Sequence, residues 1–202
     1  MGTECGSPTG VRPQNARPPT TKGTANIMKL IALVTMAAAL ALLNPVHAAE
    51  STAPNDAQIA QIVLTADTVD VDYGKLAVKT TKNAEVKAFA ETMIRDHTAV
   101  NDKAAALAKK LSLTPEASAT SKSLKSDGDK MLAKLEGMSG AEFDKAYVDN
   151  EVAYHESVIG ALNTVLLPNA KNADLKALLE TGKPIFESHL EHAKQLQKSL
   201  NK

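Results

Sequence analysis

The sequence predicts an all-α protein in which four long helices form a bundle, with a longer, partly helical crossover between the second and third of them. Two observations predict this fold. Apolar residues recur at intervals of three and four along four stretches, each long enough for about seven helical turns. No stretch alternates apolar and polar residues in the way a half-buried strand does. The connections within each pair of stretches are short, which favours two antiparallel hairpins.

The first two helices are predicted from their stripes and caps. The first begins near Asn55 or Asp56 and runs to about Thr81. Asn83 is a suitable N-cap for the second, which continues to Leu111. The stripe of the second helix contains Val86, Ala90, Met93, His97, Val100, Ala104, Leu107 and Leu111.

The crossover runs from Leu113 to Ser139. Its polar part, 116–136, is expected to form a shorter helix or a pair of turns interrupted at Gly128. A longer connection between the second and third long helices is a feature of ferritin-like bundles, so the expected fold is a ferritin-like four-helix bundle.

The last two helices have clear start signals. Ser139 and Glu142 have the spacing of a capping box, which opens a helix that continues to about Leu166 and stops at Pro168. Asn172 caps a final helix over 173–200. A bend is expected in this helix near Pro184.

The N-terminal part of the chain predicts export. Met28 and Lys29 precede an apolar run that is too short to span a bilayer, and the small-residue exit 46–48 follows it, so we expect a secretory signal peptide cut after Ala48. An uncleaved signal anchor is the alternative. The only cysteine, Cys5, precedes this segment. The expected organisation is a disordered upstream extension or mis-assigned start at 1–27, a signal peptide at 28–48, a linker at 49–54 and one bundle domain at 55–202.

Composition limits the function. The 202 residues are 44% hydrophobic and 23% charged, which is typical of a globular protein and not of a disordered chain. Lysine plus arginine equal aspartate plus glutamate at 23 each, so no basic excess favours nucleic acid as a partner. Sequence signatures for a nucleophilic serine or a phosphate-binding loop are absent, and we predict no catalytic residue and no site for an organic cofactor.

The histidines are the strongest candidates for a functional site. His97, His155 and His189 each lie within about three residues of the middle of a predicted helix. Antiparallel packing brings helix midpoints to one level, so these three imidazoles could converge and bind a first-row transition metal such as Zn, Cu or Fe. The weaker candidate ligands are Asp70 and Asp72 on the first helix, Glu151 one turn before His155, and His192 at i+3 from His189.

Two alternatives remain open at this stage. Buried histidines also form metal-free hydrogen-bond networks with aspartate and tyrosine, for which Tyr73, Tyr147 and Tyr154 are available. Asp67, like Asp70 and Asp72, lies on the first helix near the height of the histidines. Such a network would suit a structural protein or an envelope-stress interaction protein. The second alternative is a metal-dependent oxidoreductase related to ferritins by fold. The sequence contains no Glu-x-x-His motif, which disfavours ferroxidase chemistry.

Several segments resemble the secreted bacterial family called domain of unknown function 4142 (DUF4142). They are Asp70–Ala77, Arg95–Thr98 with Asn101 and Asp102, Phe143–Tyr147 leading to His155 and Glu156, and Ser188–Leu190. The resemblance covers about 55–200. It implies a ferritin-like bundle in the periplasm or outer envelope of a Gram-negative bacterium, without an established reaction.

The resemblance also bears on individual site residues. The family's recurring Asp-His pair and later histidines correspond here to Asp96 with His97, His155 and His189. Asp72 stands where many members carry Glu, and His192 lies outside the shared pattern. We therefore expect an exported bundle that binds a metal without catalysis. It would have no transmembrane helix after cleavage, and its partner would be an envelope protein or a second copy of the chain.

Overall fold

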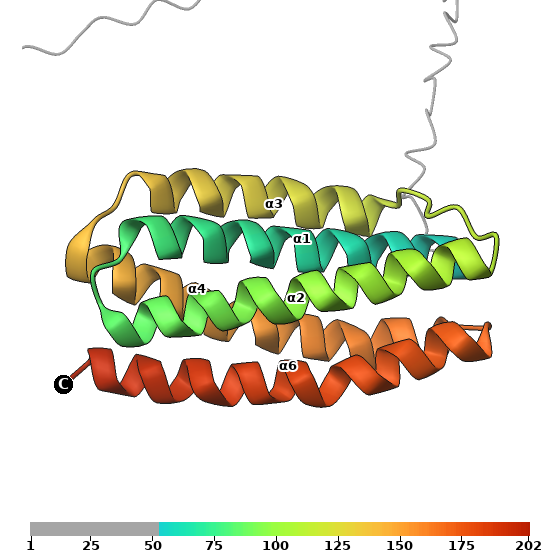
Figure 1. Ribbon diagram of the computed structural model, residues 1–202. Coiled ribbons are helices and arrows are strands. Elements are labelled where there is room, and N and C mark those ends of the chain that lie inside the picture. Colours follow the sequence, from blue (N-terminus) through green and yellow to red (C-terminus); the bar gives the residue numbers. More distant parts are fainter. Residues whose placement is uncertain (1–52) are drawn as a thin grey trace, which may run out of the picture. The chain divides into compact units, whose positions relative to one another are not determined.

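The computed structural model describes residues 53–202, and these form a purely helical domain (Figure 1). The predicted signal peptide at 28–48 and the upstream extension lie outside the described residues. Within 53–202 there is no β-strand, so the predicted all-α class is confirmed. The elements are α1 (Asp56–Thr80), α2 (Ala84–Lys110), α3 (Ala119–Glu136), α4 (Gly140–Ala161), the π-helical segment η1 (Leu162–Leu166), α5 (Leu167–Asn169) and α6 (Ala173–Leu200).

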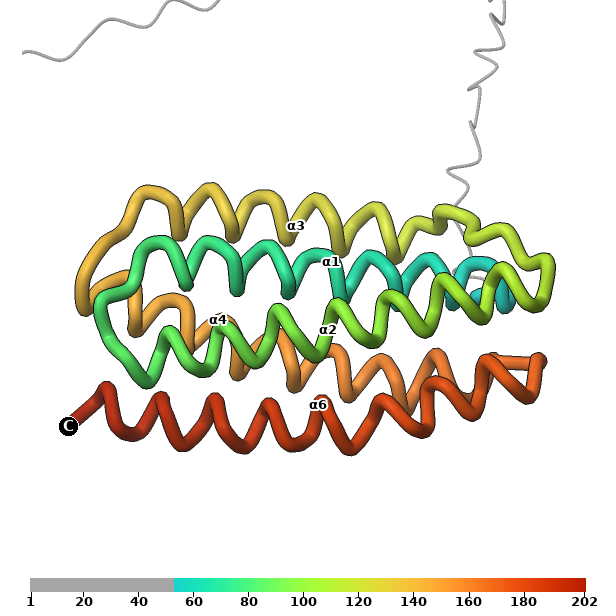
Figure 2. The backbone as a smooth tube through the Cα atoms, in the orientation of Figure 1, coloured from blue at the N-terminus to red at the C-terminus, as the bar shows by residue number. Residues whose placement is uncertain are grey.

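The four long helices pair as two antiparallel hairpins. α1 packs mainly against α2, and α4 packs mainly against α6. The crossover helix α3 returns along the length of the bundle over α1, so α2 and α4 run in the same direction (Figure 2). This is the connectivity that the long crossover predicts for a ferritin-like bundle.

Side-chain caps fix most of the helix starts. The side chains of Asn83 and Asn172 accept backbone hydrogen bonds at the starts of α2 and α6, as predicted. Asn55 forms a capping box with Gln58 at the start of α1. The capping box predicted at Ser139 is wrong, because that side chain makes no cap hydrogen bond. α4 begins instead at Gly140 with φ of 59°, a left-handed conformation that glycine adopts without strain.

Of the two alternatives predicted for the crossover, the shorter helix is confirmed and the interruption at Gly128 is wrong, since α3 is continuous from Ala119 to Glu136. Gly128 is buried where α3 lies close to α1, and a Cβ there would come within 2.8 Å of a methyl carbon of Val69. The Tyr73 hydroxyl of α1 donates a hydrogen bond to the Gly128 carbonyl at 3.4 Å. The glycine therefore allows two helices to approach each other and does not break one of them.

The end of the third long helix differs from the prediction. Its last part winds as the π-helical segment Leu162–Leu166, and helical structure continues through Pro168 to Asn169. Periodicity does not signal a π turn, which often marks a functional site. Helix α6 continues through Pro184, as predicted.

The hydrophobic core has two halves along the bundle. The aromatic half contains Val69, Tyr73, Ala77, Val86, Phe89, Ala90, Met93, Leu135, Phe143, Tyr147, Val148, Ala193 and Leu196. The aliphatic half contains Ile59, Ile62, Val100, Leu162, Leu166, Leu175, Leu179 and Phe186. Over residues 53–202, no helix combines the length and the apolar character needed to cross a membrane.

Candidate metal centre

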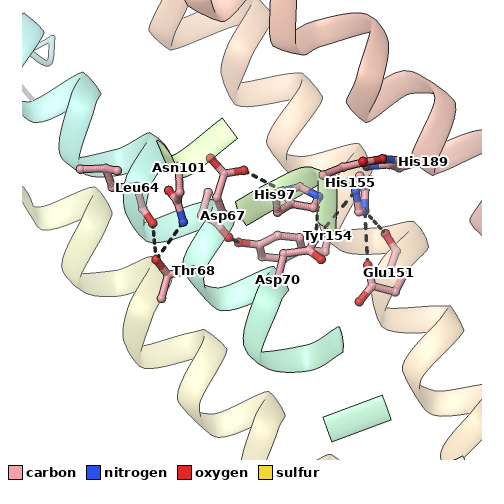
Figure 3. Close-up of polar contacts among 12 residues, drawn as sticks. Leu64, Asp67, Thr68, Asp70, His97, Asn101, Glu151, Tyr154, His155 and His189 are labelled. Atoms are coloured by element: carbon pink, nitrogen blue, oxygen red, sulfur yellow. Dashed lines mark hydrogen bonds and ion pairs between the residues drawn. The ribbon is translucent and has the colours of Figure 1, made fainter. Parts of the chain in front are cut away.

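Three buried histidines meet at the junction between the two core halves. His97 comes from α2, His155 from α4 and His189 from α6, and each side chain is at most 5% exposed. In α2, Met93 of the aromatic half and Val100 of the aliphatic half lie on either side of His97 in the sequence. The structure thus brings together the three histidines that their mid-helix positions predict will converge (Figure 3).

Each imidazole is oriented by one hydrogen bond from one ring nitrogen. His97 Nδ1 lies 2.7 Å from Asp67 Oδ1, and His189 Nε2 lies 3.0 Å from Asp96 Oδ2. His155 Nδ1 lies 3.0 Å from the Glu151 carbonyl oxygen, one turn earlier in α4. These contacts fix the ring orientations and leave the second nitrogen of each ring for another partner.

The second nitrogen of each ring has no hydrogen-bond partner. These atoms are Nε2 of His97, Nε2 of His155 and Nδ1 of His189. One ligand atom from each ring lies within 4.8 Å of the other two. The ring centroids are 5.3–5.5 Å apart, and Phe186 stacks on His97 at 5.3 Å. Three oriented imidazoles that lie close together, each with one unpartnered nitrogen, form a donor set suited to a first-row metal.

Buried carboxylates adjoin the histidines. Asp70 Oδ2 lies 3.4 Å from His97 Nε2 and 3.8 Å from His155 Nε2, beside the unpartnered nitrogen of both rings. Neither oxygen of Asp70 has a hydrogen-bond partner, and the same holds for Glu151. Asp70, Glu151 and His155 form a second close group of potential ligand atoms that shares His155 with the first. Asp70 is therefore positioned to contribute an oxygen beside the unpartnered nitrogens of His97 and His155.

Burial dominates the protonation of the carboxyl groups. It raises the pKa of Asp70 to about 6, although the nearby His97 acts in the opposite direction. Burial and the neighbouring charge of Asp70 hold the pKa of Glu151 well above its ordinary value. Burial also raises the pKa of Asp67, against the lowering effect of its hydrogen bond with His97. A nearby cation would stabilise all three ionised forms.

The three histidines differ in basicity. Burial, together with the smaller effect of the nearby His97, lowers the pKa of His155 to about 3. Burial also lowers the pKa of His189, despite its hydrogen bond to Asp96. For His97, the carboxylates of Asp70 and Asp67 outweigh burial and raise the pKa. His155 and His189 are therefore neutral at neutral pH, the form in which imidazole binds metals.

Two of the weaker candidates lie elsewhere. Asp72 has a half-exposed side chain that pairs with Lys75 at 3.2 Å. His192 is exposed and makes an edge contact with Phe89 in the aromatic half. The structure therefore does not bring Asp72 or His192 into the centre. The two carboxylates adjacent to histidines in sequence also separate: Asp96 orients His189, whereas Glu156 pairs with Lys194 on the surface.

Asp67 is the contributor for which the sequence analysis gives only a position, on the first helix near the height of the histidines, and no role as a ligand. It lies one turn before Asp70 in α1, is 2% exposed, and binds His97. The signal for it was available, because an i, i+3 pair of aspartates on an otherwise apolar helix face is costly unless the charges have partners. The tyrosines play a smaller part: Tyr154 donates to the Ala66 carbonyl oxygen at 2.9 Å, and Tyr73 donates to Gly128 of α3.

The fold and this centre define a class of protein, a helical bundle with a buried histidine and carboxylate cluster at mid-height. Within that class, the family model described as "Domain of unknown function (DUF4142)" matches residues 41–196. The chain belongs to the DUF4142 family. No curated protein and no solved structure gives a significant match.

Proposed function

We propose that this protein is an exported bundle that binds a transition-metal ion through His97, His155 and His189, with Asp70 as the oxygen ligand. The observation that carries the proposal is the pattern of hydrogen bonds at the three rings. Each ring uses one nitrogen to contact the protein, and each leaves the other nitrogen buried without a partner. Metal-binding histidines are oriented in this way by carboxylates or carbonyl groups behind them.

The charges around the centre also favour a cation. Asp67, Asp70 and Glu151 are at most 2% exposed, and the ionic contacts of these carboxylates within 53–202 are to histidines, not to lysine or arginine. Buried charges require a compensating partner, and a divalent cation supplies two positive charges at one point. Three imidazoles with one carboxylate suit Zn, Cu or Fe better than the oxygen-preferring Mg or Ca.

Export is supported by the sequence. Lys29, the apolar run after it and the small-residue exit ending at Ala48 have the order of a secretory signal peptide. We therefore place the folded domain in the periplasm or outer envelope of a Gram-negative bacterium, as the resemblance to secreted family members implies.

One observation favours a metal-free network as the second candidate function. The 2.7 Å contact between His97 and Asp67, together with the raised pKa of His97, suits an imidazolium ion shared between Asp67 and Asp70. That arrangement would neutralise part of the buried negative charge with a proton in place of a metal. It leaves the free nitrogens of His155 and His189 without a function.

Elemental analysis of the full-length protein, expressed with its leader and purified without a tag from the periplasm, tests the proposal. We expect close to one Zn, Cu or Fe ion per chain in the wild type. The triple variant His97→Ala, His155→Ala, His189→Ala should contain none. His192→Ala removes an exposed histidine outside the centre and should retain the metal.

The outcomes separate the two candidates. If the wild type contains no metal, and added Zn, Cu or Fe leaves its melting temperature unchanged, metal binding is contradicted and the proton-bridged network remains. Intact mass of the periplasmic protein checks export in the same preparation. A chain that begins at Ala49 supports the proposed cleavage, whereas an uncleaved or cytoplasmic chain contradicts it.

A further inference from the structure

A cavity of about 440 Å³ lies beside the metal centre. Protein interiors are close-packed, and voids larger than a water molecule are few. A dry engineered cavity of about 150 Å³ already accommodates benzene, and small-molecule pockets occupy about 300–1,000 Å³. The volume is therefore that of a binding site for a small molecule.

The cavity wall is mainly apolar and comes from all the long helices. Ile62 of α1, Val100 of α2, Leu124 of α3, Leu162 of η1, and Leu179 and Phe186 of α6 contribute to it. Five of these six residues, all except Leu124, are buried members of the aliphatic half. The π-helical segment provides Leu162 and Leu166 to the same wall. A ligand in this cavity would be held mainly by apolar contacts.

The entrance lies between α3 and α4. Thr120 and Asp127 of α3 and Ala153 and Ser157 of α4 line the cavity and are also exposed to solvent. These two helices make few contacts with each other, because α3 packs chiefly on α1. A small molecule can therefore reach the cavity from the surface without separation of the four long helices.

The polar groups of the wall define the chemistry of the ligand. The cavity lining within 53–202 includes no lysine or arginine, and its acidic residues are Asp67 and Asp127. An anionic head group would therefore meet negative charge. Asn150 also lines the cavity, and its side-chain Nδ2 is buried without a hydrogen-bond partner. That amide nitrogen can donate to a carbonyl or hydroxyl oxygen.

We propose that the cavity binds an uncharged apolar small molecule that carries one hydrogen-bond-accepting oxygen, with this oxygen at Asn150 and the apolar part among the aliphatic side chains. His97 and His155 also line the cavity, so the bound molecule would lie against the metal centre. The inference goes beyond the proposed function, because the apolar wall and Asn150 are present whether or not a metal is bound.

Binding of the uncharged fluorescent probe N-phenyl-1-naphthylamine to the purified full chain tests the proposal. The protein contains no tryptophan, so the probe is read without that background. Displacement by 1-decanol, decanoate and decylammonium then compares three head groups on one chain length. We expect 1-decanol to displace the probe at a concentration about tenfold lower than either charged analogue, because no charged group in the wall compensates for desolvation.

Variants locate the site. Ala153→Phe adds a ring at the exposed rim and should weaken probe binding by about tenfold or more, since a ligand cannot share space with a side chain that fills the entrance. Ala105→Phe places the same ring on an exposed position of α2 outside the cavity, and should leave binding unchanged. Asn150→Leu should remove the preference for 1-decanol over decane and leave binding of decane intact.

Metal content measured on the same samples keeps the two proposals separate. Ala153→Phe should lose the probe and keep the metal, because its side chain is on the surface. If the wild-type protein is purified without metal and still binds the probe, this result contradicts the proposed function and supports the cavity site. The cavity proposal is overturned by the absence of probe binding, by equal binding in Ala153→Phe and wild type, or by a charged analogue that matches 1-decanol.

Discussion

The two halves of the core are packed in different ways. In the aromatic half, Phe89, Phe143 and Tyr147 are fully buried, and the Tyr147 ring contacts those of Phe89 and Phe143 at 6.2 and 6.1 Å between centroids. In the aliphatic half, side chains such as Ile62 and Leu179 surround a cavity of about 440 Å³. The rings of the aromatic half thus pack closely on one another, whereas the aliphatic half borders open space next to the buried histidines.

The largest expected effect is the loss of stability when a core side chain is truncated, and it should differ between the two halves. Phe89→Ala should reduce the free energy of unfolding by about 3–5 kcal/mol, because it removes a fully buried ring and leaves a void that close-packed neighbours cannot fill. Leu179→Ala should cost about 2 kcal/mol, at the lower end for such a change, because its surroundings are already hollow. Urea unfolding of the metal-free proteins measures both. Equal losses, or a larger loss for Leu179→Ala, would contradict the proposed difference in packing.

The next effect concerns the junction between the halves. Asp67→Asn keeps the size of the side chain and weakens its hydrogen bond with His97 Nδ1, which orients the ring. The metal affinity should therefore fall about 10- to 100-fold. Competition with a chelator of known affinity measures the change. Asp72→Asn makes the same chemical change at a half-exposed position paired with Lys75, and should leave the affinity within about twofold because this pair lies outside the centre. A similar loss in both variants would show that the 2.7 Å contact has no specific role.

A third prediction uses the pH dependence of stability in the metal-free protein. Folding raises the pKa of Asp70 from 3.8 to about 6, so the folded state binds this proton more tightly than the unfolded state does. Asp70 therefore stabilises the fold below its ordinary pKa, and this contribution is lost as the pH rises towards 6. The Asp70→Asn variant does not lose stability in this way, because its side chain does not ionise. The melting temperature of the variant minus that of the wild type should therefore increase by a few degrees between about pH 4 and about pH 7. A constant difference would contradict the burial effect.

The smallest effect compares two buried glycines in helices. A Cβ at Gly182, which lines the cavity, would meet the Phe186 ring at 3.5 Å, an ordinary contact, so Gly182→Ala should stabilise by about 0.5–1 kcal/mol. A Cβ at Gly74 would lie 2.9 Å from Ile94 and 3.1 Å from the Ala90 carbonyl oxygen. Gly74→Ala should therefore destabilise the protein, and thermal unfolding should give opposite signs. Equal signs would show that the two packing environments are alike.

Much of the fold could be predicted, because each helix carries its own signals. The apolar stripes predicted the helices, and the N-caps Asn83 and Asn172 predicted where α2 and α6 begin. The errors have local causes. Ser139 and Glu142 have the spacing of a capping box, but spacing alone does not determine where a side chain points. Gly128 suggested a break in the crossover helix. The structure instead shows that a larger residue there would collide with Val69 of α1.

The site was predictable to the extent that helix geometry determines it. His97, His155 and His189 meet because antiparallel helices of similar length bring their midpoints level. Asp72 follows Asp70 by two positions, or about 200° around a helix, so the two side chains face different surroundings. The cavity gives no sequence signal, since it depends on how far α3 stands from α4.

The division of the centre between two hairpins has a consequence for folding. α1 and α2 supply Asp67, Asp70 and His97, and α4 and α6 supply His155 and His189. Each hairpin joins neighbouring stretches of chain, whereas the contact between Asp96 and His189 spans 93 positions. Short-range contacts form early and long-range contacts form late. The site is therefore completed only when the hairpins dock, and a bound ion would act as a cross-link that this cysteine-free bundle otherwise lacks.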